Sequence, residues 1–250
     1  MPPASPTTPD RYSPPVKSRG LLTGVPFDRA TRAGQKYTDR FKRWDVTPKG
    51  RVDPSLCPGI YNFDGGVVFF EAKMAIDADG SPTQSVLDSS GGANKHTSYE
   101  FPGSIGINAE VVPYYVVPTF DDPARARPNV PFEGSGDRFV VDFGMKHGNL
   151  GVVIFEDRIT GAIFADEGPA MKLGEASIRV HEIIRKPPAP WKGDPANKVL
   201  KDASEEKGVL YFIFTDTEFD INDFGVARQK EMADAIQTAA IVRFNQFKGA

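Results

Sequence analysis

Two carboxylic acids in one glycine-containing stretch have the spacing that acid and base chemistry requires. The stretch, Ala162 to Ser177, reads A-I-F-A-D-E-G-P-A-M-K-L-G-E-A-S. A short apolar run delivers Asp166 and Glu167 to a Gly-Pro break, and a second glycine precedes Glu175. Hydrolysis by paired carboxylates needs one group that keeps its proton near neutral pH and one that has released it. Turns and helix caps use the same residue types, because a carboxylate oxygen there accepts backbone N–H groups.

A second acidic motif follows an expected strand. The sequence from Gly59 onward predicts two strands separated by a Gly-Gly pair, and the second ends in D-A-D-G, with Asp77 and Asp79. Residues two apart on a strand point to the same face, so both carboxylates are candidates for binding a ligand. An EF-hand calcium loop would need more oxygen ligands and a closing Glu, and Asp88 is the one later candidate in range. We therefore expect no metal site and no cofactor, and sugar binding and simple turn chemistry both stay open.

Two further side chains are candidates for contacting a substrate. His96 lies in the polar segment Ser81 to Pro102, where a plain surface role is the alternative. The β-prone run Glu110 to Phe120 contains two prolines, which restrict it to an edge strand or a bulged strand. Its adjacent tyrosines, Tyr114 and Tyr115, point to opposite faces, so one belongs to the core and the other could stack on a sugar ring. We take Tyr115 as the stacking candidate.

The composition indicates a mainly β fold of the α+β class. The 250 residues are 40% hydrophobic and 25% charged, and they include 24 Gly and 22 Pro, which favours many turns and short strands. The patterns predict a strand at Arg138 to Phe143, a hairpin over 150–165 and a buried strand at Gly208 to Thr215. They also predict a helix after Glu175 and an amphipathic C-terminal helix within Asn222 to Phe247.

The ends of the chain and its charge restrict the possible partners. Prolines and few apolar residues near the start predict a poorly ordered lead over 1–35, followed by one domain over 36–250. A net charge of -3 gives no overall field for nucleic acid. No apolar stretch approaches the roughly 20 residues that span a bilayer, and the start lacks the pattern of a secretory signal. The single cysteine, Cys57, excludes an intrachain disulfide.

Segments of the chain resemble, in order, the fungal-type chitosanases of glycoside hydrolase family 75. They are F-F-E-A-K-M-A-I-D-A-D-G, V-V-P-Y-Y-V-V-P, L-G-V-V-I-F, A-I-F-A-D-E-G-P with L-G-E-A-S, and G-V-L-Y-F-I-F-T. Together they cover roughly 59–215, and the D-x-G-P and G-E-A-S pair is the most specific part. Family members commonly carry Gly before the Asp of D-x-G-P and a neutral residue after it, where this chain has Ala165 and Glu167.

The resemblance implies an endo-acting, inverting hydrolase of chitosan whose essential carboxylates are Asp166 and Glu175. One would protonate the glycosidic oxygen while the other activates a water, and we lean towards Glu175 as the acid and Asp166 as the base. Asp77 and Asp79 would bind the amino groups of glucosamine units through charge-assisted hydrogen bonds. Glu167 is a further candidate beside Asp166, either acting in the site or pointing elsewhere.

The resemblance also implies a fold and a location. The fold would be a β-barrel-like domain of double-psi character with short helices, and the protein would be a secreted monomer. Two alternatives keep the carboxylates or the fold but change the function. One is a peptidoglycan-cleaving, lysozyme-like effector, and the other is a non-catalytic carbohydrate-binding domain.

Overall fold

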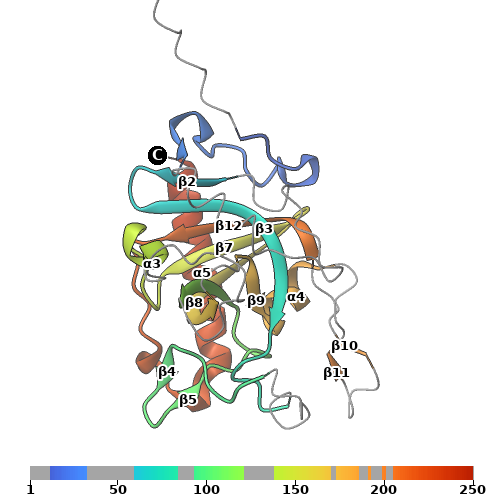
Figure 1. Ribbon diagram of the computed structural model, residues 1–250, viewed down its shortest axis with the longest axis vertical. Helices are drawn as coiled ribbons and strands as arrows, with labels where there is room; N and C mark the ends of the chain where they lie inside the picture. The colour runs from blue at the N-terminus through green and yellow to red at the C-terminus, as the bar shows by residue number, and fades with distance from the viewer. Residues whose placement is uncertain are drawn as a thin grey trace, which may run out of the picture.

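The main body of the molecule is a closed barrel of six strands (Figure 1). A computed structural model describes residues 12–32, 59–83, 93–120, 138–169, 173–185, 191–192, 199–200 and 205–249. The barrel strands are β3 (Val67–Asp77), β6 (Tyr114–Phe120), β7 (Leu150–Phe155), β8 (Arg158–Pro169), β9 (Glu175–Ser177) and β12 (Glu205–Phe214). Their order is β3-β12-β7-β8-β6-β9, and β9 pairs back with β3 to close the ring.

Short elements surround the barrel. The remaining strands are β1 (Thr31–Arg32), β2 (Ile60–Phe63), β4 (Glu100–Phe101), β5 (Ile105–Gly106), β10 (Trp191–Lys192) and β11 (Val199–Leu200). The helices are α3 (Arg138–Asp142), α4 (Ile178–Ile184) and α5 (Gln229–Lys248), with 3-10 turns η1 (Val16–Ser18), η2 (Phe27–Arg29), η3 (Ile221–Asp223) and η4 (Val226–Arg228). The mainly β prediction is therefore confirmed.

Burial of both faces of β12 in the core explains its continuous apolar run. β12 lies between β3 and β7, and every residue from Val209 to Phe214 is buried. A strand that is covered on both faces needs apolar side chains throughout rather than an alternating pattern. Most barrel pairs are antiparallel, but β3 with β9 and β6 with β8 are parallel.

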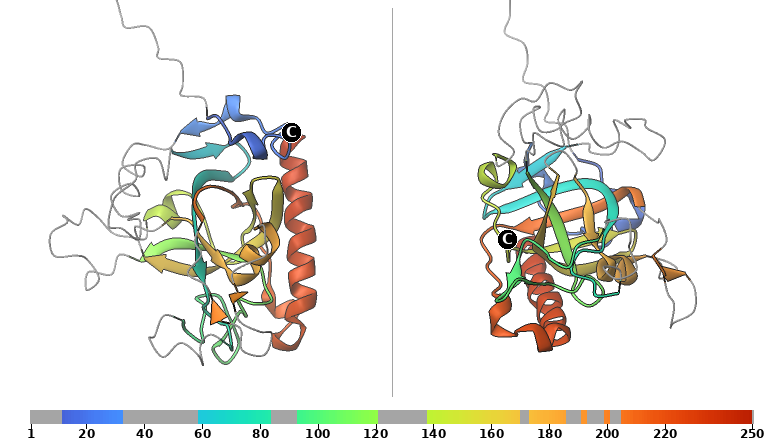
Figure 2. Two further views of the ribbon diagram at one scale, coloured as in Figure 1. Left: turned by 90° about the vertical axis from the view of Figure 1, so that its right-hand side faces the viewer. Right: turned by 60° about the horizontal axis from the view of Figure 1, so that its bottom comes forward.

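Two clusters of buried side chains form the core. One cluster draws residues from all six barrel strands, including Phe70, Tyr211 and Phe164, and therefore fills the barrel. The other lies under α5, which runs along one side of the barrel (Figure 2). The buried residues of α5 are Met232, Ala233, Ile236, Ala240, Phe244 and Phe247. Their spacings of three and four confirm the amphipathic C-terminal helix.

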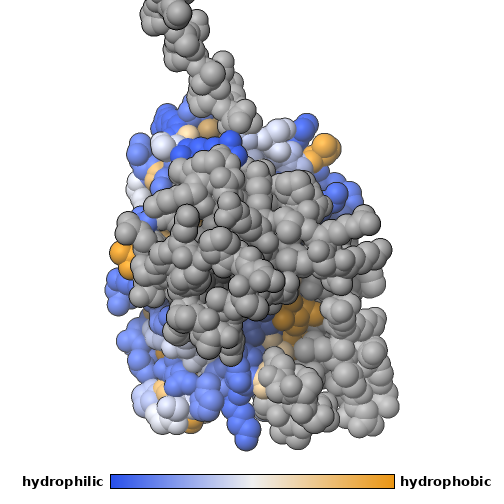
Figure 3. All heavy atoms as spheres, viewed as in Figure 1, coloured by the Kyte–Doolittle hydropathy of each residue, from blue (hydrophilic) through white to orange (hydrophobic). Residues whose placement is uncertain are grey.

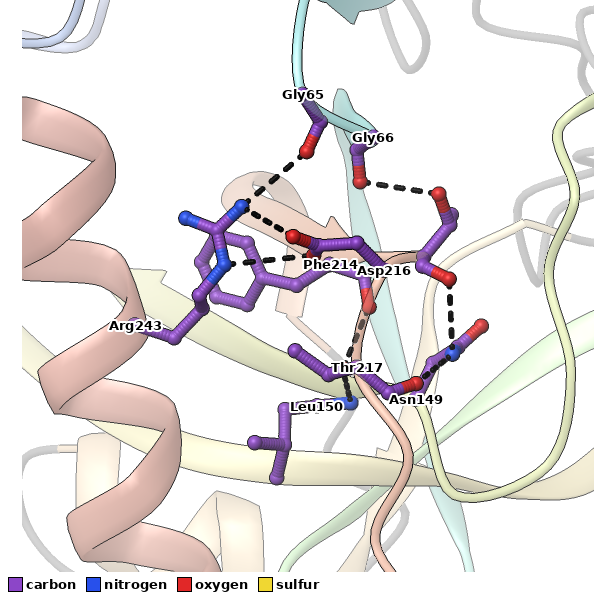
Figure 4. Close-up of polar contacts among 9 residues, drawn as sticks. Gly65, Gly66, Asn149, Leu150, Phe214, Asp216, Thr217 and Arg243 are labelled. Carbon is purple, nitrogen blue, oxygen red and sulfur yellow. Dashed lines mark hydrogen bonds and ion pairs between the residues drawn. The ribbon is translucent and has the colours of Figure 1, made fainter. Parts of the chain in front are cut away.

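A polar network joins α5 to the turns beside it (Figure 4). The guanidinium of Arg243 donates to Asp216 at 2.9 Å and to the carbonyl oxygen of Gly65 at 3.2 Å. Close by, the hydroxyl of Thr217 accepts the backbone N–H of Leu150 at 2.7 Å. These bonds tie the β2–β3 turn and the end of β12 to the helix and to the start of β7.

The structure corrects the expected N-terminal lead for residues 12–32. This segment packs on the barrel: Tyr12 donates to Glu71 at 2.6 Å, and its ring lies 4.7 Å from that of Phe69. Leu22 is buried, and β1 pairs with β2. A few apolar side chains between prolines are enough to attach the segment, because each buries most of its surface. The boundary expected at residue 35 lies outside the described residues.

One other element differs in type from its prediction. Residues Arg138 to Asp142 form helix α3 instead of a strand. The three apolar residues of this segment, Phe139, Val140 and Val141, suit a strand and a short helix equally, so the pattern does not separate the two.

Apolar side chains on the described surface are scattered. The exposed large ones are Val16, Ile105, Val141, Val226 and Val242. On the face drawn in Figure 3, the coloured apolar atoms form separate spots among hydrophilic ones. Among the described residues, no helix has the length and apolar character needed to cross a membrane.

Substitution of Gly174 should test barrel closure. Gly174 has φ +88°, and an added Cβ would lie 2.2 Å from the carbonyl oxygen of Lys73 in β3. Gly174→Ala should therefore destabilise the fold by about 2–4 kcal/mol, measured by chemical denaturation. Gly208→Ala is the control, since Gly208 also has positive φ, at +79°, but open space around it. Equal losses in both variants would contradict the role of the close β3 contact.

Candidate active site

The register of the barrel places Asp166 and Glu175 on the two sides of one residue. Val116 in β6 pairs with Asp166 of β8 on one side and with Glu175 of β9 on the other. Directly paired residues put their side chains on the same face of a sheet. The two carboxylates therefore stand on one face, with their backbones about 10 Å apart across two strand spacings.

Asp166 lies within strand β8, which does not end at the expected Gly-Pro break. β8 continues past the apolar run to Pro169, and Gly168 pairs with Pro118 of β6. The pairing with β6 extends β8 through the Gly-Pro pair, which the local sequence predicted to be a break. Pairing with β6 gives both carboxylates a hydrogen-bonded base, with a bulge in the β6–β8 register just before Val116 and Asp166.

Barrel closure brings Asp77 and Asp79 close to Asp166 and Glu175. Asp77 ends β3, where it pairs with Ser177, two residues beyond Glu175 in β9. Its side chain is buried, as is that of Asp166. One carboxylate oxygen from each of Asp77, Asp79 and Asp166 lies within 4.8 Å of the others. The two acidic motifs of the sequence therefore form one cluster with Glu175.

Hydrogen bonds hold the carboxylates of this cluster in different ways. Asp166 Oδ1 accepts both the backbone N–H and the hydroxyl of Ser98, each at 2.8 Å. Asp79 accepts the backbone N–H of Asn94 at 2.8 Å and its side-chain amide at 2.9 Å, one on each oxygen. Asp77 Oδ1 accepts the backbone N–H of Asp79 at 2.9 Å.

Burial and like charge make Asp77 the proton-holding member of the cluster. Burial raises its pKa well above the usual range, and the charges of Glu175, Asp166 and Asp79 raise it further. The pKa of Asp79 is also raised by burial, but the hydrogen bonds from Asn94 oppose the shift. The cluster therefore keeps a proton at a pH where isolated aspartates have lost theirs. That combination of a protonated acid beside other carboxylates is what acid and base chemistry uses.

The same geometry offers oxygen ligands to a cation. Hard cations such as Ca²⁺ take carboxylate oxygens, and the oxygens of Asp77, Asp79 and Asp166 are close enough to share one ion. The sequence predicted no metal site, because the EF-hand pattern was incomplete. The clustered aspartates come instead from two separate strands and a turn.

Tyr115 is not placed to stack on a sugar. Its ring is 1% exposed, and its hydroxyl donates to the carbonyl oxygen of Asn149 at 3.0 Å. Tyr114 is also buried, and its hydroxyl donates to the carbonyl oxygen of Asp79 at 2.9 Å. Both rings are covered because Tyr114 packs in one cluster of the core and Tyr115 packs in the other. The predicted bulge is present after Tyr115.

His96 and Glu167 lie apart from the four clustered carboxylates. His96 is exposed, and its Nδ1 lies 2.9 Å from Glu100 Oε1. Glu167 follows Asp166 in β8 and so points to the opposite face. Its Oε1 lies 3.3 Å from Nε2 of His147. Of the predicted site residues, the structure thus brings Asp77, Asp79, Asp166 and Glu175 together. His96 and Glu167 pair with other residues.

Asn94 and Ser98 are contacts of the cluster that the sequence did not single out. Tyr114, which the sequence named beside Tyr115, contacts the cluster through the carbonyl oxygen of Asp79. Ser98 and Asn94 belong to the polar segment from which His96 was chosen, and nothing in the local pattern ranks them above it. Ser98 is 68 residues from Asp166. The one local signal was the concentration of polar residues before β4.

His181 secures the strand that faces Glu175. It is fully buried in α4, and its Nε2 lies 3.1 Å from the carbonyl oxygen of Ala75. A carbonyl oxygen only accepts, so Nε2 carries the proton and Nδ1 is unprotonated. Ala75 pairs with Glu175 in the register of β3 and β9. Burial lowers the pKa of His181 to about 4, which keeps the ring neutral.

The comparisons with known proteins identify no family. No family model matches the chain, and no curated protein matches it either. The chemistry of the cluster and the resemblance of the sequence segments are therefore what carry a functional conclusion.

Asp77→Asn should stabilise the protein at neutral pH. The folded pKa of Asp77 is raised, so the stability associated with its protonated form is present at acid pH and is lost as pH rises from about 4 through that folded pKa. Asn cannot ionise, so the variant should have a higher melting temperature at pH 7, by about 2–4 °C for each kcal/mol gained. Asp234→Asn on the exposed face of α5 is the control. A melting temperature below that of the wild type at pH 7 would contradict the assignment.

His181→Gln should reduce the sensitivity of the fold to acid. The folded pKa of about 4 lies below the unfolded value of 6.5, so the stability associated with neutral His181 is present above 6.5 and is lost as pH falls towards 4. Over this range the free energy of unfolding should fall by about 3 kcal/mol. Denaturation curves at pH 7 and pH 4 should differ less in the variant than in the wild type. His96→Gln, at an exposed histidine, should leave the difference unchanged.

Proposed function

We propose that the chain is an endo-acting glycoside hydrolase that cleaves β-1,4-linked amino-sugar polymer, chitosan, by an inverting mechanism with two carboxylates. The observation that carries the proposal is the register that sets Asp166 and Glu175 on either side of Val116. From backbones about 10 Å apart, two carboxyl groups can adopt the separation of roughly 6.5–9.5 Å that inverting glycosidases use to admit a water.

In this proposal Asp166 is the general base. Ser98 holds its Oδ1, and among the described residues none donates a hydrogen bond to Oδ2. Oδ2 is therefore the oxygen that can accept a proton from the attacking water. The rigid strand β8 sets the direction of that oxygen.

Glu175 is the general acid, and Asp77 is its partner. Burial first, and then the charge of Glu175, raise the pKa of Asp77, so the two carboxyl groups interact. Protons on interacting carboxyl groups belong to the pair rather than to one member. The pair can thus deliver a proton to the glycosidic oxygen while Asp166 activates the water on the other side.

The charge of the cluster supports an amino sugar as the substrate. Four carboxylates on one patch favour a cationic ligand, and the protonated amine of a glucosamine unit forms charge-assisted hydrogen bonds with carboxylates. Asp79 is the group proposed to face such an amine, since Asp77 keeps its proton. The glycan of peptidoglycan carries acetylated amines and would gain less from this charge.

The finer features of the resemblance belong to the same proposal. The double-psi arrangement is supported by the six strands of the barrel and by its two parallel pairs. Secretion is proposed because a polysaccharide hydrolase has to reach its polymer. A monomeric state is proposed on the resemblance.

Asp166→Asn and Glu175→Gln should each abolish most of the activity. The wild-type protein should release reducing ends from chitosan, and each variant should lower kcat by about 10²–10⁴-fold, because each removes one proton-transfer group. Glu231→Gln, at an exposed position in α5, should keep full activity. NMR of the first product should show inversion at the anomeric carbon.

Each alternative function has its own outcome. Full activity in both variants would exclude the two-carboxylate mechanism. Cleavage of peptidoglycan with no cleavage of chitosan would assign the site to a lysozyme-like effector. Binding of chito-oligosaccharides without turnover would assign the fold to a non-catalytic domain.

A further inference from the structure

One short segment supplies hydrogen-bond donors to two of the clustered carboxylates. Asn94, at one end of it, donates its backbone N–H and its amide to Asp79. Ser98, at the other end, donates its backbone N–H and its hydroxyl to Asp166. Asp79 follows β3 and Asp166 lies in β8, so the segment, residues 94–98, bridges two parts of the barrel.

Contacts on both sides keep this segment in place. Tyr99 donates its N–H to the carbonyl oxygen of Ala165, the residue before Asp166, at 2.9 Å. Its ring stacks on that of His147 with centroids 5.5 Å apart. Thr97 accepts the N–H of Ile107 at 2.9 Å. Ser98 is therefore held by neighbours on each side, although it lies at the surface.

The two donors of Ser98 act on one oxygen of Asp166. Both reach Oδ1 at 2.8 Å, and they approach from the backbone and from the side chain of the same residue. Two donors on one oxygen restrict rotation of the carboxyl group about its Cβ–Cγ bond. When this rotation is restricted, the second oxygen, Oδ2, keeps one direction. A general base needs such a fixed direction, because its oxygen must lie close to the attacking water.

We propose that Ser98 is a positioning residue that orients Asp166 for proton abstraction, and that Asp79 supports it by anchoring Asn94. This inference rests on the proposed hydrolase function. Ser98 touches neither the water nor the sugar, and it acts through Asp166. The acidic D-A-D-G turn thereby helps to orient a base that lies three strands away around the closed barrel.

Kinetics of Ser98 variants on chitosan test the positioning role. Ser98→Ala removes the hydroxyl and keeps the amide, so kcat should fall about tenfold while KM stays within twofold. Ser98→Thr retains a hydroxyl and should restore most of kcat. Ser13→Ala, at another exposed serine, should have no effect. A wild-type kcat in Ser98→Ala, or a fall in Ser98→Thr equal to that in Ser98→Ala, would overturn the inference.

Amide hydrogen exchange gives a second readout that needs no activity. In Asp166→Ala the N–H of Ser98 loses its acceptor and should exchange about tenfold faster or more. The N–H of Tyr99 donates to a backbone carbonyl instead and should keep its protection. Asn94→Ala should also speed exchange at Ser98. Unchanged exchange at Ser98 in Asp166→Ala would overturn the orienting contact, even in an active enzyme. A wild-type protein that cleaves no glycan would instead overturn the proposed function, and the catalytic part of this inference with it.

Discussion

Pairing of β9 with β3 is the constraint on which the rest of the structure depends. In the strand order of the barrel these two strands are the first and the last, and only their contact makes β3, β9, β6 and β8 consecutive neighbours. Asp77, Glu175 and Asp166 lie on three of these strands, so an open sheet would leave the first far from the last. Gly174 makes the contact sterically possible, because a side chain there would collide with Lys73. His181 then fixes β3 at the residue opposite Glu175.

The cluster that closure creates has an electrostatic cost. Four carboxylates meet where two of them are buried, and both desolvation and mutual repulsion oppose their ionised forms. The structure offsets part of this cost with donors from Asn94, Ser98 and the backbone of Asp79. The remaining repulsion is avoided because one carboxyl group of the cluster keeps its proton. A site that holds a proton next to an oriented carboxylate is poised for acid and base chemistry, and a cationic substrate would relieve its repulsion.

Rigid strands and a short surface segment have different parts in this arrangement. The hydrogen-bonded register of the strands fixes the backbone position from which each carboxylate projects. The segment from Asn94 to Ser98 sets how two carboxyl groups are turned. Such a division places the reacting groups on the stiffest part of the fold, while the polar residues around them come from a loop.

The sequence by itself determined the mainly β character, several of the elements and the identity of the acidic residues. The apolar runs of β7 and β12, the glycine pair before β3 and the periodicity of α5 are local features, and local propensity suffices to recognise them. Asp166, Glu175, Asp77 and Asp79 were recognised from motifs. Only the tertiary structure decided that they share one site, that Tyr115 is covered and that residues 12–32 pack on the barrel. It also decided that Ser98 binds a carboxylate of this site, whereas His96 pairs with Glu100. These outcomes depend on strand register, on barrel closure and on contacts between residues far apart in the chain, and a local pattern carries no information about which distant residue will lie beside it.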